Sequence, residues 1–446
     1  MTARTRGQPV ATPEAPARLS FPARDCTARL LQHGYRFSER LRSSHPESDP
    51  DAIPLRLAGA PALLLRGPQG VRLFSDTAVV SREDATPRLV AGPLFGHGAV
   101  HGLDGASHVH RKGLFVDVTR SPRPMELVGL AGAEWQSARE RWRPGAGLVV
   151  EHEAVRVFGR AVFRWAGIDL PEAQVDRLAQ RLATIVDGFA VPGPAYARAV
   201  LARRQTDAWA ARLVEDVRDG TVEAAPGKAL AIAAGWTDDA GELLPAKVAA
   251  VELQNVLRPT IAVSRFAAFA VLALAQHGDW RRRLASEEAA AAAQVGSDRR
   301  RVPSRDSSAW AFAHEVRRLT PFVPLLAGLT DVEVEHRGVR VPAGTRLLLD
   351  VVGTNRDPRF WDRPLDFDPG RFLDDRERER DALVPQGGGL VAAGHRCPGE
   401  DTTLGLIATT SAFFAGLSWT MPAQDLGVSS RRMPTRPASG ARVVLT

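Results

Sequence analysis

One stretch of sequence decides the fold of this 446-residue chain: Gln386-Gly387-Gly388-Gly389-Leu390-Val391-Ala392-Ala393-Gly394-His395-Arg396-Cys397-Pro398-Gly399-Glu400. It places Cys397 between glycines, directly before an apolar helical pattern at Thr402–Leu417. Glycine on both sides lets the backbone wrap closely around a bulky group. The N-terminus of the following helix and the neighbouring Arg396 both favour a thiolate over a thiol at Cys397.

An anionic sulfur in such a loop suits an iron ligand, since a thiolate donates charge to haem iron and helps O–O bonds to break. The alternative is a buried structural cysteine in a Gly-rich turn. A phosphate-binding loop does not fit, because no Gly-Lys-Ser/Thr follows. Cys26 is the only other cysteine, so a four-cysteine zinc site is excluded. One disulfide stays open, but so few cysteines in a long chain favour a reducing compartment.

Composition indicates a soluble globular protein, with 44% apolar and 24% charged residues. The net charge of +7 raises nucleic acid as a partner, but 58 Lys and Arg residues interleaved with 51 acidic ones indicate a solvated surface. We find no apolar run near the ~20 residues that span a bilayer, and no signal peptide in Met1–Phe21. We therefore expect a cytoplasmic protein without a membrane span, with a flexible extension at residues 1–21 and a single domain at residues 22–446.

Apolar spacing predicts a mainly α fold with a minor β-sheet region. Residues at three- and four-residue spacing predict helices at Ala133–Trp142, Glu172–Asp187, Arg198–Asp219, Pro245–Leu274 and Ser308–Leu319. Strand signals cluster in Pro54–Phe74, Asp331–Val352 and Ser429–Thr446. This order predicts one helical domain with a small sheet built from both ends of the chain.

The cysteine loop and an upstream Glu315-Val316-Arg317-Arg318 together resemble the cytochrome P-450 superfamily. Glu-x-x-Arg alone is a common helical salt bridge, but in this order before a cysteine loop it is specific. The resemblance implies a haem-thiolate fold in which Arg371, within Phe367-Asp368-Pro369-Gly370-Arg371-Phe372, completes a buried ion network with Glu315 and Arg318. The loop departs from the usual pattern, because Leu390 rather than Phe stands seven residues before Cys397.

That departure is typical of one branch, the bacterial fatty-acid peroxygenases, which include alkene-forming fatty-acid decarboxylases. The chain is similar to this branch through several ordered motifs: Leu94–Gly96, His101–Gly105, His108–Lys112, Glu252–Pro259, Glu315–Pro324, Gln386–Glu400 and Arg432–Gly440. The resemblance implies haem b with Cys397 as the axial thiolate ligand. It also implies hydrogen peroxide as the oxidant, a long-chain fatty acid as the substrate, and no obligatory reductase.

Arg258-Pro259 lies in the apolar stretch that should cross the oxygen face of such a haem. Oxygen-activating relatives carry an acid–alcohol pair there, which delivers protons to dioxygen. Pro259 lacks an N–H and clashes with the carbonyl of Asn255, so we expect a helix kink. A buried Arg258 is costly unless paired, and a substrate carboxylate can pair with it bidentately. That carboxylate can then be the acid–base group that cleaves hydrogen peroxide. The alternative is an arginine that extends out of an ordinary helix.

Further site residues follow from position in the resembling family. His101 is expected near the oxygen face with Phe95 packed against it, although a core histidine is the alternative. Haem propionates need cations, and the resemblance assigns them to Arg82, His108, Lys112 and His395. Phe322 and Pro324 are expected to line the substrate pocket. His101 hints at decarboxylation as well as hydroxylation of the alpha or beta carbon without deciding between them.

Three other functions remain open from sequence. A redox-partner-dependent fatty-acid monooxygenase would share the fold, but the absent acid–alcohol pair disfavours it. A non-catalytic haem carrier or sensor would bind the cofactor without converting a fatty acid. A nucleic-acid-binding protein is suggested by the pI of about 10.2 alone, without zinc-finger spacing or an uninterrupted basic stripe.

Overall fold

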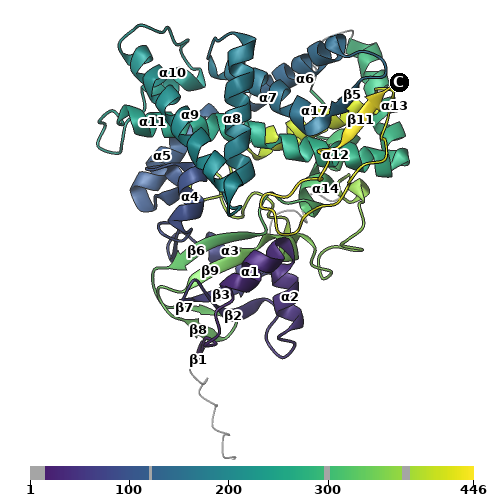
Figure 1. Cartoon of the computed structure of the whole chain (residues 1–446). Helices are drawn as coiled ribbons and strands as arrows, with labels where there is room; N and C mark the ends of the chain where they lie inside the picture. Colours follow the sequence, from purple (N-terminus) through teal and green to yellow (C-terminus); the bar gives the residue numbers. More distant parts are fainter. Residues whose placement is uncertain (1–15, 120–122, 296–301, 374–381) are drawn as a thin grey trace, which may run out of the picture.

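The computed structural model describes residues 16–119, 123–295, 302–373 and 382–446. In Figure 1 most helices gather in the upper part of the molecule and the largest sheet lies in the lower part. The helices are α1 Thr27–His33, α2 Phe37–Ser43, α3 Gly67–Ser75, α4 Arg88–Phe95, α5 Gly105–Val118, α6 Arg123–Arg141, α7 Val150–Ala166, α8 Glu172–Gly188, α9 Pro194–Arg218, α10 Ala229–Ala234, α11 Ala246–Ala262, α12 Ser264–Gln276, α13 Gly278–Val295, α14 Ser308–Leu319, α15 Val351–Asn355 and α17 Glu400–Ala415, with short 3-10 helices η1 Gly34–Arg36, η2 Val100–Gly102 and η3 Pro369–Phe372.

The strands form three sheets, ordered β2-β3-β9-β6-β4, β1-β8-β7 and β10-β11-β5. They are β1 Ala17–Arg18, β2 Ala52–Leu57, β3 Ala60–Leu65, β4 Val80–Ser81, β5 Gly147–Val149, β6 Leu325–Thr330, β7 Val334–His336, β8 Val339–Val341, β9 Arg346–Asp350, β10 Trp419–Thr420 and β11 Arg442–Leu445. In the largest sheet β3 runs parallel to β9, with Leu63 opposite Leu347. The mainly α fold with a minor sheet region is confirmed.

Two details of the predicted sheet are wrong. The C-terminal strand β11 does not join the large sheet, because it pairs with β5 and β10 instead. Residues 67–75 form helix α3 although a strand was expected through Phe74. Pro68 in the first turn explains this helix, since its fixed φ suits a helix start and its missing N–H costs no hydrogen bond there.

The long apolar stretch predicted as one helix is divided into α11 and α12 by a turn at Val263. Pro259 lies inside α11 and cannot donate to the carbonyl of Asn255. The helix continues past Pro259 to Ala262 before it ends. The helical residues Ala246–Gln276 are long and apolar enough to cross a membrane, and the mean hydropathy of their most apolar window is 1.5. From the sequence we expected no apolar stretch of this length. However, 89% of the most apolar window is buried inside the protein.

The predicted ion network at α14 is confirmed. Glu315 and Arg318 are both fully buried and form two hydrogen bonds, of 2.6 and 2.8 Å. Arg371 Nε lies 3.3 Å from Glu315 Oε1. Arg318 also donates to the carbonyl of Asn355, whose side-chain oxygen accepts the N–H of Val384 at 2.8 Å. The network therefore connects α14 to the segment that leads into the cysteine loop.

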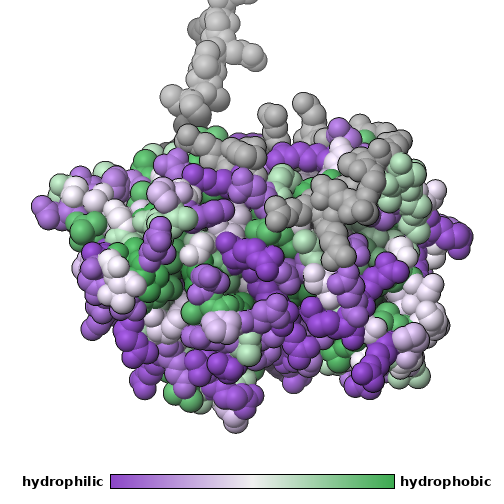
Figure 2. All heavy atoms as spheres, turned by 90° about the horizontal axis from the view of Figure 1, so that it is seen from above, coloured by the Kyte–Doolittle hydropathy of each residue, from purple (hydrophilic) through white to green (hydrophobic). Residues whose placement is uncertain are grey.

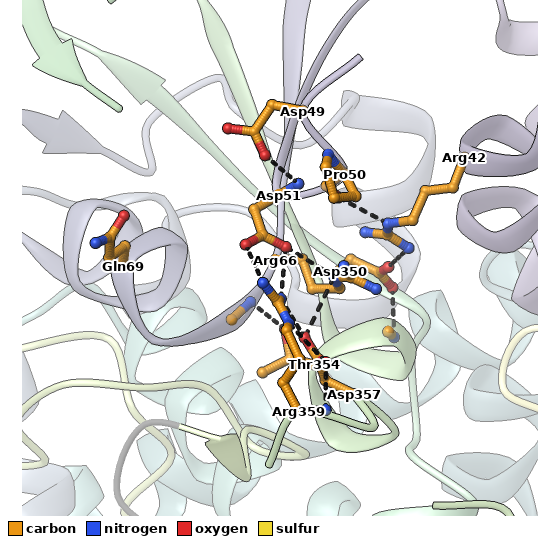
Figure 3. A network of polar contacts seen from close by, with 12 residues as sticks. Arg42, Asp49, Pro50, Asp51, Arg66, Gln69, Asp350, Thr354, Asp357 and Arg359 are labelled. Carbon is orange, nitrogen blue, oxygen red and sulfur yellow. Dashed lines mark hydrogen bonds and ion pairs between the residues drawn. The ribbon is translucent and has the colours of Figure 1, made fainter. Parts of the chain in front are cut away.

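A second ion network connects the N-terminal sheet to the segment after β9 (Figure 3). Asp51 accepts hydrogen bonds of 2.7 Å from two nitrogens of Arg359 and one of 3.0 Å from Arg66. Asp357 also pairs with both arginines. Four charged side chains from three separate segments thus stabilise one junction.

The N-terminal segment predicted as a flexible extension is described only from residue 16. Residues 1–15 of that segment lie outside the described residues, whereas Ala17–Arg18 form β1 and pair in parallel with β8. On the face of the molecule in Figure 2, hydrophilic side chains cover most of the surface and apolar ones lie scattered between them.

Candidate active site

The cysteine loop is fixed by the two helices beside it, α14 and α17. The N–H of Cys397 donates to the carbonyl of Gln386 at 3.1 Å, and the Gln386 amide donates to Thr403 of α17 at 3.1 Å. Arg317 of α14 pairs with Glu400, the first residue of α17. The loop is therefore held independently of any ligand, and it presents the sulfur of Cys397 at a defined place.

The charge of the Cys397 sulfur is not controlled as the sequence suggested. Burial raises the pKa of the Cys397 thiol, while the N–H of Gly399 and the cation of Lys112 lower it. Arg396 instead pairs with Glu400, with 2.8 Å between Nη2 and Oε2. The stabilisation of the thiolate by Arg396 stays a prediction, and the pairing with Glu400 weakens it because that carboxylate offsets the charge of this arginine. Both Cys26 and Cys397 are free, so no disulfide joins them.

The four residues expected to face haem propionates lie close together. Asp104 accepts the backbone N–H of Arg82 at 2.8 Å and lies 3.3 Å from His395 Nε2. His395 stacks on His108 with 4.0 Å between ring centroids. Lys112 donates to the carbonyl of Arg396 at 2.7 Å. The structure thus brings the side chains of His108, Lys112 and His395 together beside Cys397, with Asp104 as an acidic partner that the sequence did not reveal. Arg82 joins Asp104 through its backbone, while its guanidinium donates to the carbonyl of Phe74 at 2.7 Å.

Burial controls the protonation of the residues that are expected near the haem propionates. It lowers the pKa of Arg82 to about 10, a value at which the guanidinium is still protonated at neutral pH. Burial, then the electrostatic effects of His395 and Lys112, lower the pKa of His108 to about 4. Burial also lowers the pKa of His395 below its usual 6.5. At pH 7 the positive charge of the cluster is therefore carried by Arg82 and Lys112, while the two imidazoles are neutral hydrogen-bonding groups.

Arg258 is buried in α11 with only 3% of its surface exposed. Its Nη2 donates to the side-chain oxygen of Asn255 at 2.8 Å, whereas its Nη1 has no hydrogen-bond partner among the described residues. Burial, then the cation of Arg203, lower the pKa of Arg258 to about 9. The guanidinium therefore stays charged at neutral pH and keeps one donor nitrogen for another group.

His101 and Phe95 form the predicted pair. Their rings stack with 4.0 Å between centroids and 13° between planes. His101 has a large accessible surface, yet burial, then the cation of Arg258, lower its pKa to about 3. His101 is therefore a neutral imidazole at pH 7 that lies within electrostatic reach of Arg258. Its place on the oxygen face stays a prediction.

Two buried residues connect these groups although the sequence analysis gave them no role. The carboxylate of Glu252 accepts the N–H of Val100 at 2.8 Å and Arg111 Nη1 at 2.9 Å. Asn255 donates to Glu252 Oε2 at 3.0 Å. The spacing Glu252-x-x-Asn255-x-x-Arg258 places these residues on one helix face, which is the signal that could have identified them.

The two expected pocket residues after α14 are held by other partners. The carbonyl of Phe322 accepts the hydroxyl of Tyr35 at 2.5 Å, and the carbonyl of Pro324 accepts the N–H of Val351 at 3.0 Å. These contacts anchor the segment to α15 and to the N-terminal part of the chain. They do not join it to Arg258, so the lining role of Phe322 and Pro324 stays a prediction.

The residues present fit the predicted haem. Cys397 offers one half-buried sulfur, and the dominant influence of burial on its pKa shows that protein surrounds it. Lys112 supplies a cation next to the cysteine loop, and Arg82 supplies a second one within electrostatic reach of His395 in that loop. A sulfur ligand and cations for carboxylates are two features that a thiolate-bound haem requires.

Comparisons with known proteins agree with this site. The family model for Cytochrome P450 matches residues 267–401. A single-residue variant of cytochrome P450 OleT in complex with arachidonic acid is 30% identical with a TM-score of 0.84, covering 94% of this chain and 96% of that chain. Cytochrome P450SP alpha (CYP152B1) in complex with (R)-ibuprophen is 33% identical with a TM-score of 0.85, covering 95% and 98%.

Sequence similarity to curated relatives is shorter. The bifunctional protein STORR of Papaver somniferum is 38% identical over 103 residues, which are 22% of this chain and 11% of that protein. The chain thus spans about a ninth of this relative, whereas the two solved structures match over nearly their whole length. From its cysteine loop, its ion network and these full-length matches, the chain belongs to the cytochrome P450 family of haem-thiolate enzymes.

Proposed function

We propose that this protein is a haem-thiolate peroxygenase that uses hydrogen peroxide to hydroxylate long-chain fatty acids at the alpha or beta carbon and to decarboxylate a part of them. In this proposal residues 22–446 are a single catalytic domain of a cytoplasmic protein. The enzyme needs no reductase, binds no nucleic acid and does not span a membrane.

The proposal depends above all on the unsatisfied charge of Arg258. The charges around it include two ion pairs, the buried pair of Arg111 with Glu252 at 2.9 Å and the half-exposed pair of Arg203 with Asp207 at 2.9 Å. No acidic side chain in the described part of the chain forms a salt bridge with Arg258. Arg258 therefore brings one positive charge that no ion pair of the described residues balances, and its Nη1 is a free donor; a monovalent carboxylate satisfies both.

The solved relatives support a carboxylate ligand. The OleT variant structure contains arachidonic acid, and one P450SP alpha structure contains (R)-ibuprophen. Both ligands carry one carboxylic acid on an apolar body. By analogy, the ligand of this chain is a fatty acid whose carboxylate pairs with Arg258 and whose alkyl chain extends along apolar side chains.

The residues then have separate roles. Cys397 would hold the haem and Arg82, His108, Lys112 and His395 would pair with its propionates, and the bound haem would supply the chemistry that oxidises the substrate. Arg258 fixes the carboxylate, which acts as the acid–base group and moves a proton between the two oxygens of hydrogen peroxide. Pro259 shapes α11 at this point. Neutral His101, held against Phe95, forms a hydrogen bond with the peroxide near the reacting carbons.

The test is a reaction of the purified, haem-loaded protein with a long-chain fatty acid and hydrogen peroxide in the absence of reductase. We expect hydroxy acids, together with terminal alkenes one carbon shorter, identified by mass spectrometry. Arg258→Ala is expected to abolish turnover with haem still bound, whereas Arg212→Ala, an exposed arginine of α9, keeps it. Product formation only with a redox partner and NAD(P)H would identify a monooxygenase, and no product under either condition would favour a haem carrier or sensor.

A further inference from the structure

One buried carboxylate connects the two groups that the proposed reaction uses, each through one neighbouring residue. Glu252 lies in α11 with no exposed surface. Its Oε1 accepts the N–H of Val100, the first residue of η2, and His101 is the next residue. Its Oε2 accepts the amide of Asn255, which in turn accepts Arg258. Glu252 thus accepts one hydrogen bond from the segment that carries His101 and another from Asn255, which in turn holds the side chain of Arg258.

The polarity of these hydrogen bonds is fixed by the charges at their ends. Arg258 can only donate, and an ionised Glu252 can only accept. The Asn255 amide must therefore direct its oxygen toward Arg258 and its nitrogen toward Glu252, as observed at 2.8 and 3.0 Å. A chain of hydrogen bonds between a cation and an anion polarises each member and strengthens the whole. This arrangement selects one orientation of the Arg258 guanidinium.

Arg111 favours the charged form of Glu252, against burial, which raises the pKa of this carboxyl. Its Nη1 lies 2.9 Å from Glu252 Oε1 and also donates to the carbonyl of Gly98 at 3.3 Å. The same arginine thus fixes the backbone just before η2. Since Arg111 neutralises Glu252, the carboxylate orients Arg258 without cancelling the positive charge that the substrate requires.

We propose that Glu252 is a positioning residue that sets the place of Arg258 relative to His101 and thereby selects which carbon of the fatty acid is oxidised. This inference rests on the proposed function, because it assigns the carboxylate to Arg258. A carboxylate held at a fixed distance from His101 presents the same carbon in every turnover. A misplacement of about 1 Å can change a rate by about 10²-fold, so small shifts of Arg258 redistribute the products.

The test compares Glu252→Gln with the wild type in the haem-loaded protein. A glutamine has one acceptor oxygen, so it cannot serve both Val100 and Asn255 in the observed way, and it leaves Arg111 without an anion. The matched control is Glu134→Gln, a buried acid of α6 that pairs with Arg164 at 3.3 Å. Asn255→Ala is a second variant, because it removes only the connection to Arg258 and keeps Glu252 with Arg111 and Val100.

Three readouts are measured for each variant. We expect Glu252→Gln to lose hydrogen-exchange protection at the Val100 amide, to bind a long-chain fatty acid roughly tenfold or more weakly, and to spread the products over more carbons. Asn255→Ala should keep the protection of Val100 but share the other two effects. Glu134→Gln should match the wild type in all three. If Glu252→Gln does not fold, Asn255→Ala alone decides through affinity and products.

The possible results distinguish the proposed role of Glu252 from the proposed function of the protein. Unchanged affinity and unchanged product positions in the folded variants, with an active wild type, would overturn the role of Glu252 and leave the proposed function intact. A wild type that binds the fatty acid but does not turn over with peroxide would overturn the proposed function, while the affinity and exchange readouts still decide whether Glu252 orients Arg258. A wild type that binds no fatty acid would overturn both.

Discussion

At the scale of single residues, Cys397 shows how a surrounding structure prepares a ligand. Its backbone N–H donates to the carbonyl of Gln386 and the Arg317–Glu400 pair holds the loop beside it, while the sulfur interacts with the Gly399 N–H and the Gln386 side chain. Since the first two contacts do not involve the sulfur, the loop should stay in place without it. We predict that Cys397→Ala folds but loses the spectrum of a thiolate-bound, reduced carbon monoxide complex. A variant that keeps this spectrum would refute Cys397 as the iron ligand.

Some residues of the site can be identified from the sequence alone. Cys397 was identified from local glycines, and Glu315 with Arg318 from their spacing, because these features depend on neighbours in the chain. The roles of Asp104 and Glu252 depend on partners far away in sequence, such as His395 and Val100. Their carboxylates look like ordinary surface acids in the sequence. Only the folded chain shows that they organise the two sides of the site.

At the scale of elements, the α8–α9 hairpin packs too closely for a side chain at Gly188. A Cβ there would lie 2.2 Å from the carbonyl oxygen of Ala195 and 2.9 Å from the Cβ of Ala199. We predict that Gly188→Ala lowers the free energy of unfolding by about 1–3 kcal/mol through overpacking. Chemical denaturation followed by circular dichroism measures this change.

The control for this prediction is Gly113→Ala in the middle of α5. A Cβ at Gly113 would meet no atom within 4 Å among the residues that the structure describes. Alanine has the better helix propensity, so this variant should be unchanged or more stable by up to about 1 kcal/mol. Equal stability losses in the two variants would mean that α8 and α9 are not packed as closely as described.

The ends of some helices can be predicted from the sequence, whereas the ends of others cannot. Residues Ser308–Leu319 form α14 with the predicted ends, because apolar spacing and the Ser307 cap coincide there. The predicted helix at Pro245–Leu274 instead divides at Val263, four residues after Pro259. A proline indicates that a helix is interrupted nearby, but the packing of the helix determines the residue at which it ends.

At the scale of the whole molecule, the Asp51–Arg66–Asp357–Arg359 network connects distant parts of the chain (Figure 3). Burial alone would raise the pKa of Asp51, but hydrogen bonds from Arg359 and Arg66 outweigh it and hold the pKa below 3.8. The pKa of Asp357 is lowered in the same way, against the effect of burial and mainly through Arg359. Near and below pH 3.8 the unfolded chain therefore binds more protons than the folded protein.

This difference predicts the direction of the acid response. The free energy of unfolding should fall as the pH falls through the range around and below 3.8, and Asp51→Asn should make this fall less steep. The variant should also be less stable at pH 7, because Arg359 and Arg66 lose a buried partner. Urea denaturation at a series of pH values checks both effects. An Asp51→Asn protein with an unchanged pH dependence would show that this network does not control acid stability.

The proposed function depends on Arg258 as the residue that binds the carboxylate of the substrate. The most direct measurement is an equilibrium titration of the haem-loaded wild type and Arg258→Ala with a long-chain fatty acid and with the primary alcohol of the same length. The wild type should bind the acid roughly tenfold or more tightly than the alcohol, since a hydrogen bond to a charged group contributes about 1.5–3 kcal/mol. Arg258→Ala should bind both equally. An undiminished preference for the acid in Arg258→Ala would contradict the account.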